Sequence, residues 1–231
     1  MLAEDRRKVL RELNLRCRPS ERGEVSFCAL RLRAAVLLAA DSALRIGEMC
    51  ALDAVQVIDD PAVPRWRLRS VGYIRPEQSK GRRVGPDQWD SAGSFLLGDE
   101  PRAALRAYLL EAKRRQYLPW PPKSGDPLFV SVRGNGNGNG KDHPEDARQR
   151  LSVRTLQWQW GDFQQHAALP SPYHWHCLRH TAMTACAEAT NGNVAIVAAF
   201  GRCDVKTAMR YCRAYLTPQR MLELRNQIQL R

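Results

Sequence analysis

The spacing of apolar residues along the chain predicts a mostly helical protein. Apolar residues recur with the helical period over residues 4–13 and 153–169, which indicates an amphipathic helix in each segment. A long alanine-rich run over residues 26–52 predicts a buried helix, a turn near residues 41–43, and a second helix that begins around Arg45.

Helical spacing continues over residues 99–115, where Asp99 is the expected N-cap, and over residues 177–230 in four short segments. Residues 65–76 are rich in β-branched and aromatic side chains, and a turn is expected soon afterwards at Gly81. The predicted fold class is therefore mainly α with one small antiparallel β-sheet (α+β), placed in the first half of the chain.

The helical pattern is interrupted between residues 118 and 149. Proline-rich sequence at 118–122 predicts a loop, and residues 127–131 form a short apolar element. A Gly-Asn repeat follows at 134–140 and is of low complexity. We expect residues 133–149 to be a flexible insertion, and we assign no function to it.

The charge balance favours a polyanionic partner. The chain has 36 Lys and Arg against 24 Asp and Glu, a net charge of +12. Most of the positive charge is arginine, whose planar fork holds two phosphate oxygens at once and keeps its charge at working pH. Nucleic acid is the simplest partner of this kind, and a generally basic surface without a dedicated partner is the alternative.

The cysteines and the N-terminus indicate the compartment. Seven scattered cysteines with no C-x-x-C pair are typical of reduced thiols rather than of a disulfide framework or a zinc ribbon. The first ten residues are charged throughout, so we expect no signal peptide. The most apolar run, 34–44, contains Asp41 and is too short to span a bilayer. We expect a soluble intracellular protein without a membrane partner.

Four side chains near the C-terminus are candidates for chemistry. His176 and Arg179 lie three residues apart and face one way on a helix, so both can reach the same phosphate. His176 and His180 also have the spacing of a zinc helix, but the Glu of H-E-x-x-H is missing and Arg179 between them would repel a cation. For Tyr211 the alternative to a nucleophile is an ordinary half-buried tyrosine.

Three segments resemble the signature boxes of one family. "ALRIGEMCAL", "HCLRHTAMTAC" and "AFGRCDVKTAMRY" are similar to the three boxes of the tyrosine recombinase (phage integrase) catalytic domain, in the family's order. The resemblance extends from about Leu2 to Tyr215. It implies a site-specific recombinase that cleaves and rejoins DNA through a 3′-phosphotyrosyl intermediate, without metal or nucleotide cofactor.

The resemblance also implies a role for each matching residue. Arg45 and Arg179 would clamp the phosphate, and His176 would donate to the phosphate or handle the proton of the tyrosine. Lys80, in "SKGRRV", would be the general acid for the leaving 5′ oxygen, and Tyr211 would be the nucleophile. Tyr215, four residues later on the same helical face, is the rival tyrosine.

Three further positions belong to the expected site. Arg202 stands where the family usually has histidine or tryptophan; as an arginine it can still donate to a phosphate oxygen. Glu48 lies three residues after Arg45 and is expected to hold or tune that arginine, the alternative being a weak surface ion pair. His180 is expected to be packed and hydrogen-bonded inside the fold.

By the same resemblance, the chain is a single catalytic domain over residues 1–231 that acts on double-stranded DNA beside other protomers in a tetrameric synapse. A helper DNA-binding protein is a further partner that the family allows. We expect that the family's separate N-terminal DNA-binding domain is not part of this chain. Residues 216–231 form either a helix packed on its own domain or one docked in trans. The expected location is the cytoplasm, with the nucleoid.

Two other functions stay open at this point. The same motifs permit a type IB-like topoisomerase, which relaxes DNA without choosing a sequence. Arg202 instead favours a catalytically weakened DNA-binding regulator that keeps the fold.

Members of the family usually clamp DNA between the catalytic domain and the N-terminal DNA-binding domain. Because only the catalytic half of this clamp is expected here, we predict weak DNA binding that depends steeply on salt. Phosphate contacts release counterions, so the logarithm of the binding constant should fall linearly with the logarithm of salt concentration. Fluorescence anisotropy on duplex DNA at increasing salt measures this slope. A flat salt dependence would contradict the prediction.

Overall fold

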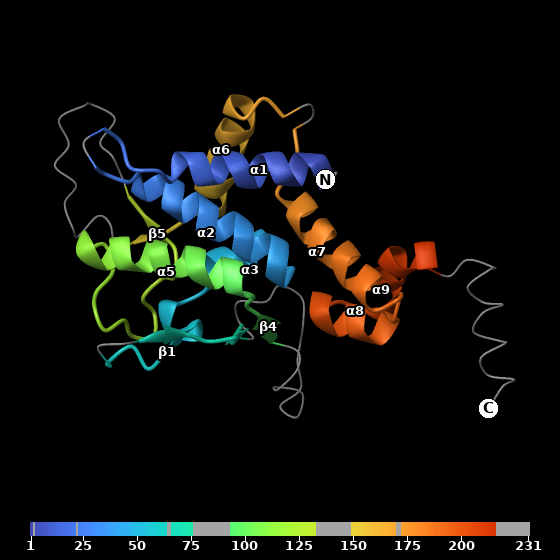
Figure 1. Ribbon diagram of the computed structural model, residues 1–231. Coiled ribbons are helices and arrows are strands. Elements are labelled where there is room, and N and C mark those ends of the chain that lie inside the picture. The colour runs from blue at the N-terminus through green and yellow to red at the C-terminus, as the bar shows by residue number, and fades with distance from the viewer. Residues whose placement is uncertain are drawn as a thin grey trace, which may run out of the picture.

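Two long helices form the centre of the protein. Helix α2 (Phe27–Ser42) packs along α5 (Asp99–Arg114), and α1 (Ala3–Arg16) crosses α2 on its other side (Figure 1). Helix α2 is buried on almost every side, as its alanine-rich sequence predicts, and Ser26 caps it by accepting a hydrogen bond from the Ala29 amide. Helix α5 begins one residue earlier than expected from its caps, because Gly98 rather than Asp99 is its N-cap.

The computed structural model describes residues 1, 3–21, 23–63, 66–75, 93–132, 149–169 and 172–215. Three predictions fall outside these residues: the hairpin lysine Lys80, most of the expected insertion at 133–149, and the C-terminal helix over 216–231. No helix in the described part is both long and apolar enough to cross a membrane.

The strands form three antiparallel pairs in the described residues, where the sequence predicted one sheet. The pairs are β1 (Ile58–Asp59) with β2 (Arg67–Leu68), β3 (Val71–Tyr73) with β4 (Ser94–Leu96), and β5 (Val130–Ser131) with β6 (Gln149–Arg150). Strand β6 begins inside the predicted insertion, so its first residue, Gln149, is part of the fold.

Gly72 fixes the register of the second strand pair. It lies opposite Phe95, and a Cβ atom at Gly72 would stand 2.4 Å from the Phe95 ring. Only a glycine allows this ring to cover the strand and remain in the core.

The C-terminal helices form a second, smaller apolar cluster beside the main core. Helix α6 (Val153–His166) packs into the main core, whereas the second cluster is built by α7 (His176–Ala189), α8 (Val194–Gly201), α9 (Val205–Cys212) and the short helix η5 (Arg213–Tyr215). Helix α7 leads from the main body to α8 and α9, which pack on it at one side of the molecule (Figure 1). Met183, Val197 and Cys212 lie at the centre of this second cluster.

A buried carboxylate, Asp53, joins segments that lie far apart in the sequence. It follows α3 (Ile46–Ala51) and precedes the short helix η1 (Ala54–Gln56). Its oxygens are 2.9 Å from Arg75 Nη1 and 2.6 Å from Arg150 Nη2, and Oδ2 accepts a hydrogen bond from the Gly125 amide. The Asp53 side chain therefore holds Arg75, Gly125 and Arg150, which lie far apart in the sequence, close to one another.

We predict that Asp53→Asn destabilises the fold. The amide keeps the shape of the carboxylate but places an N–H against a guanidinium, and it should lower the free energy of unfolding by at least about 2 kcal/mol. Urea denaturation followed by circular dichroism measures the change.

The matched control is Asp59→Asn. Asp59 pairs with Arg69 at 3.6 Å with both side chains exposed, and such exposed pairs contribute about 1 kcal/mol or less. Equal losses in the two variants would contradict a structural role specific to Asp53.

Candidate active site

Arg45 is held at the start of α3 by a buried carboxylate. The chain is extended at Arg45, and Glu48, in the first turn of the helix, reaches back to it. Glu48 Oε2 accepts the Arg45 amide at 2.9 Å, and Oε1 lies 2.6 Å from Arg45 Nη1. The Glu48 side chain is 2% exposed and that of Arg45 is 39% exposed. The pair is therefore more than a weak surface ion pair: one end of the Arg45 guanidinium is fixed and the other faces solvent.

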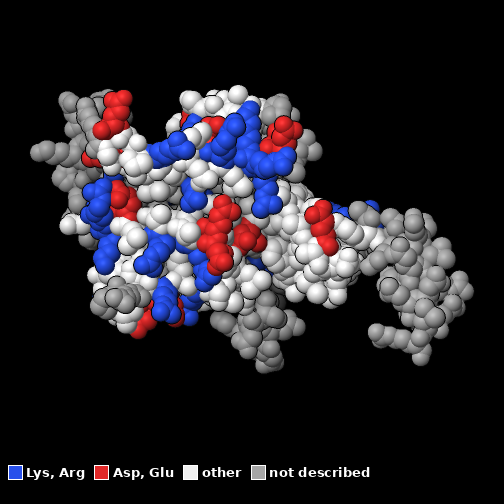
Figure 2. All heavy atoms as spheres, viewed as in Figure 1, with Lys and Arg blue, Asp and Glu red and all other residues white. Residues whose placement is uncertain are grey.

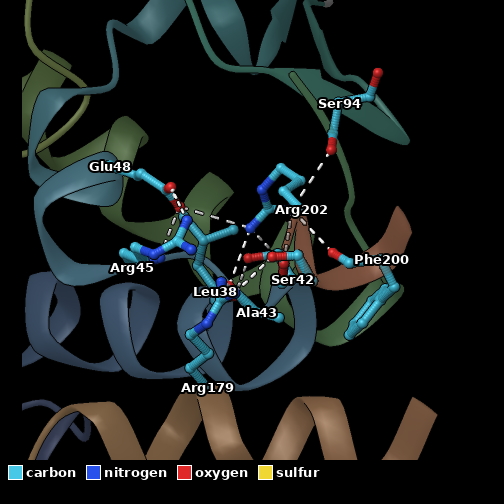
Figure 3. Close-up of polar contacts among 10 residues, drawn as sticks. Leu38, Ser42, Ala43, Arg45, Glu48, Ser94, Arg179, Phe200 and Arg202 are labelled. Carbon is cyan, nitrogen blue, oxygen red and sulfur yellow. Dashed lines mark hydrogen bonds and ion pairs between the residues drawn. The ribbon is translucent and has the colours of Figure 1, made fainter. Parts of the chain in front are cut away.

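Arg179, on α7, points into the protein rather than outward. Its Nη1 donates to the Ala43 carbonyl and its Nη2 donates to the Gly201 carbonyl at 2.6 Å (Figure 3). Arg179 is 4% exposed. Arg179 thus lies beside Arg45 but is anchored on the backbone at both ends of its guanidinium.

Arg202 requires a correction to the sequence-based expectation. We expected it to donate to a phosphate at the surface, but it is 5% exposed and its guanidinium donates to backbone carbonyls of the α2–α3 turn (Figure 3). Arg202 ends α8 in the left-handed conformation, with φ at 48°, and the carbonyls that it contacts come from a turn far away in the sequence. In the described structure its side chain points toward Ala43 and Glu48.

Tyr211 and His180 are in direct contact. The hydroxyl of Tyr211, on α9, is 2.6 Å from Nδ1 of His180, on α7. The rings of His180 and His176 lie edge to face, with centroids 4.5 Å apart. His180 is hydrogen-bonded, as expected, but it is exposed rather than packed inside the fold, so that part of the expectation is wrong. Its i, i+4 spacing from His176 had already placed both rings on one helical face.

Burial and neighbouring charges determine the protonation states of His176, His180 and Tyr211. Burial lowers the pKa of His176, as do the nearby His180, Arg179 and Arg45. Burial and the Arg179 charge likewise lower the pKa of His180. Burial raises the pKa of Tyr211 in spite of Arg179. At neutral pH the phenol therefore keeps its proton and both imidazoles are uncharged, so His180 Nδ1 can accept that proton.

A cavity of about 820 Å³ opens beside the arginines. Arg45, Glu48, His176 and Arg179 line one side of it, and aromatic residues of α6 and the segment before α7 line the rest, including Trp160 and Trp175. Arg45 and His176 are thus accessible to a molecule that approaches this side of the protein.

Three further expectations concern Lys80, the rival tyrosine Tyr215 and metal binding. Lys80 lies outside the described residues, so its role stays a prediction. Tyr215 packs against the turn at Gly192, away from His180. Within the described part of the chain, no three His, Cys, Asp or Glu side chains gather closely enough to hold a metal ion.

Solved structures of recombinases share this fold. The chain aligns with XerA recombinase (TM-score 0.59, 18% identity, 98% of this chain and 62% of that one). It aligns with XerH site-specific recombinase bound to difH substrate with a TM-score of 0.57 and 17% identity, over 91% of this chain and 49% of that one. It aligns with the Tn1549 transposon integrase in complex with circular intermediate DNA with a TM-score of 0.63 and 15% identity, over 99% of this chain and 66% of that one. It therefore spans between about half and two thirds of these proteins.

At such low identity these structures establish the fold alone. No curated protein matches the sequence. The model of the phage integrase family, however, matches residues 20–217, which include all three boxes and the Tyr211–His180 pair. With its fold in agreement, the chain belongs to the phage integrase family of tyrosine recombinases.

Proposed function

We propose that the chain is the catalytic domain, over residues 1–231, of a site-specific recombinase that cleaves and rejoins double-stranded DNA with Tyr211 as the nucleophile. The observation that carries the proposal is the 2.6 Å contact between the Tyr211 hydroxyl and His180 Nδ1. A phenol with a raised pKa needs an acceptor for its proton, and an uncharged imidazole at hydrogen-bond distance supplies one.

The proposed reaction begins at this contact. As the Tyr211 oxygen attacks phosphorus, its proton passes to an imidazole, and the bond from phosphorus to the 5′ oxygen breaks. That oxygen takes up a proton, for which Lys80 is the proposed donor. The product is a 3′-phosphotyrosyl link and a free 5′ hydroxyl. A second 5′ hydroxyl then reverses the sequence and restores tyrosine, so bond energy is conserved without a nucleotide cofactor.

The charge of the site favours a bound phosphate. Arg45 and Arg202 lie within ion-pair distance of Glu48, and Arg179 shares the Ala43 carbonyl with Arg202 (Figure 3). Burial lowers the pKa of both Arg179 and Arg202, and the nearby Arg45 charge lowers it further. A phosphate would relieve this repulsion, most directly at the exposed end of Arg45.

DNA and further protomers are the proposed partners. XerH is bound to difH substrate in one related structure, and the Tn1549 integrase is in complex with transposon right end DNA in another. On the face shown in Figure 2, Lys and Arg are spread among acidic residues rather than gathered in one patch. We propose that the DNA-binding surface lies on the side of Arg45, His176 and Tyr211, and that protomers assemble there on DNA.

One observation favours a second function. Because Arg202 is directed into the protein, the site has one fewer surface donor than the family pattern suggests. This supports a DNA-binding regulator that has kept the fold with weakened catalysis. DNA binding without a covalent product would distinguish the regulator, and relaxation of plasmids without a cognate site would indicate a topoisomerase.

The first experiment tests the nucleophile. We expect wild-type protein to form a covalent adduct with nicked DNA taken from the ends of the mobile element that carries the gene, and Tyr211→Phe to form none. Tyr215→Phe is the matched control and should retain the adduct, because Tyr215 does not contact His180. A denaturing gel detects the product. An adduct that persists in Tyr211→Phe and is lost in Tyr215→Phe would refute the assignment.

A second prediction concerns pH. Burial holds the pKa of His180 below its ordinary 6.5, so adduct formation should be pH-independent around neutrality and fall as the pH drops through a value below 6.5. His180→Asn keeps a hydrogen-bond acceptor close to the position of Nδ1 but cannot take up the proton, so it should slow the reaction by about a hundredfold and abolish the decline due to His180. His180→Gln places its amide farther out, near the position of Nε2, and should be at least as slow.

Single-turnover cleavage between pH 5 and 9 measures these profiles. DNA affinity is measured at each pH as a control, and an unchanged affinity shows that the protein has not unfolded. Identical acid limbs in wild-type protein and His180→Asn would assign the titration to another group and count against His180.

A further inference from the structure

Arg202 caps the C-terminal ends of two helices at once. Its Nη atoms donate to the carbonyls of Ser42 (3.2 Å) and Ala43 (3.0 Å), at the end of α2, and to that of Phe200 (3.2 Å), in the last turn of its own helix α8. A helix end leaves carbonyls without partners and carries partial negative charge, which a cation stabilises. Histidine and tryptophan have too few N–H groups for these contacts, whereas arginine has five.

The same guanidinium shares a carboxylate with Arg45. Arg202 Nη2 lies 3.7 Å from Glu48 Oε2, while Glu48 Oε1 is 2.6 Å from Arg45 Nη1 (Figure 3). With Arg202 on one side of the carboxylate, Arg45 holds only the other oxygen through its side chain. The two cations also repel each other, which favours the outward position of the Arg45 fork.

Arg202 and Arg179 converge on one carbonyl. Both donate to Ala43, two residues before Arg45, and Ala43 is itself in the left-handed conformation, with φ at 52°. Both arginines come from the C-terminal half of the chain, which carries Tyr211. They therefore connect the helices that present the nucleophile to the turn that presents Arg45.

We propose that Arg202 is a positioning residue: it orients Arg45 through Glu48 and the Ala43 turn, and it does not bind the scissile phosphate itself. This inference rests on the proposed function for its effect on cleavage. To reach a surface phosphate, Arg202 would have to leave buried carbonyls without donors. Arg45 alone of the three guanidiniums would then present an exposed end to the DNA.

A double-mutant cycle tests the coupling. Arg202→Met, Arg45→Met and the double variant are compared by single-turnover cleavage of the nicked DNA, with DNA affinity measured in parallel. We expect Arg202→Met to lower the cleavage rate at least about tenfold and the affinity less than about twofold. In the double variant, loss of Arg202 should add almost nothing to the loss of Arg45, because one residue acts through the other. Multiplicative effects would overturn the proposal and place Arg202 on the phosphate.

Arg202→Lys provides a second test if Arg202→Met does not fold. Lysine keeps the charge, but its point charge cannot contact two helix ends and Glu48 together. It should reduce cleavage in the presence of Arg45 and have no effect in its absence. Reduction by the same factor in both backgrounds would also overturn the proposal.

A second measurement does not depend on cleavage. In protein labelled at arginine, the guanidinium NMR signals of Arg45 report its orientation. We expect these signals to shift in Arg202→Lys and to stay in place in the control Arg210→Lys, an exposed residue of α9. If wild-type protein forms no adduct, the proposed function fails while this experiment still decides the position of Arg45. Arg45 signals unchanged in Arg202→Lys would refute the positioning role.

Discussion

The carbonyl groups at the C-terminal end of α2 impose the constraint on which the site depends. Helix α2 stops at a left-handed Ala43 inside the protein, where buried carbonyls need hydrogen-bond donors from the protein itself. Two guanidiniums supply them, from Arg179 and Arg202. The position of α7 and α8 beside the main core and the start of α3 at Arg45 are thus determined by one turn of the backbone.

This arrangement explains why the site combines charged arginines with uncharged histidines. Arginine remains protonated even where burial lowers its pKa, to about 10 for Arg202. Histidine in the same surroundings loses its proton, since burial and the arginines both act against a second cation. The same structure therefore provides fixed positive charge for an anion and a neutral acceptor for the proton of Tyr211.

Local patterns predicted the parts of the fold that local forces determine. The amphipathic spacing of α5 and α6 and the helix start at Arg45 are confirmed, and the sequence boxes bring Arg45, Arg179 and Tyr211 to one region. The inward position of Arg202 was not predictable in this way. It depends on a left-handed residue and on carbonyls 159 and 160 positions away in the chain.

The strand pairing also depends on contacts that the sequence pattern does not give. The turn expected at Gly81 lies outside the described residues, but β3 pairs with β4 on either side of that segment, and the register depends on the space that Gly72 leaves for the Phe95 ring. Contacts of this kind follow from packing and not from the period of the sequence. His180 was likewise assigned to the interior, because its spacing on α7 does not reveal which helix faces it.

The buried carboxylate of Asp53 has a consequence for how the protein can change. Arg75 and Arg150, both bound to it, stand at the edges of segments 76–92 and 133–148. In general, doubling the length of a loop between fixed ends costs only about 0.6 kcal/mol. A fluorescent domain inserted after Ser131, which pairs with Gln149 beside Arg150, would therefore measure how well the Asp53 anchor holds the fold when the chain between two paired strands is lengthened.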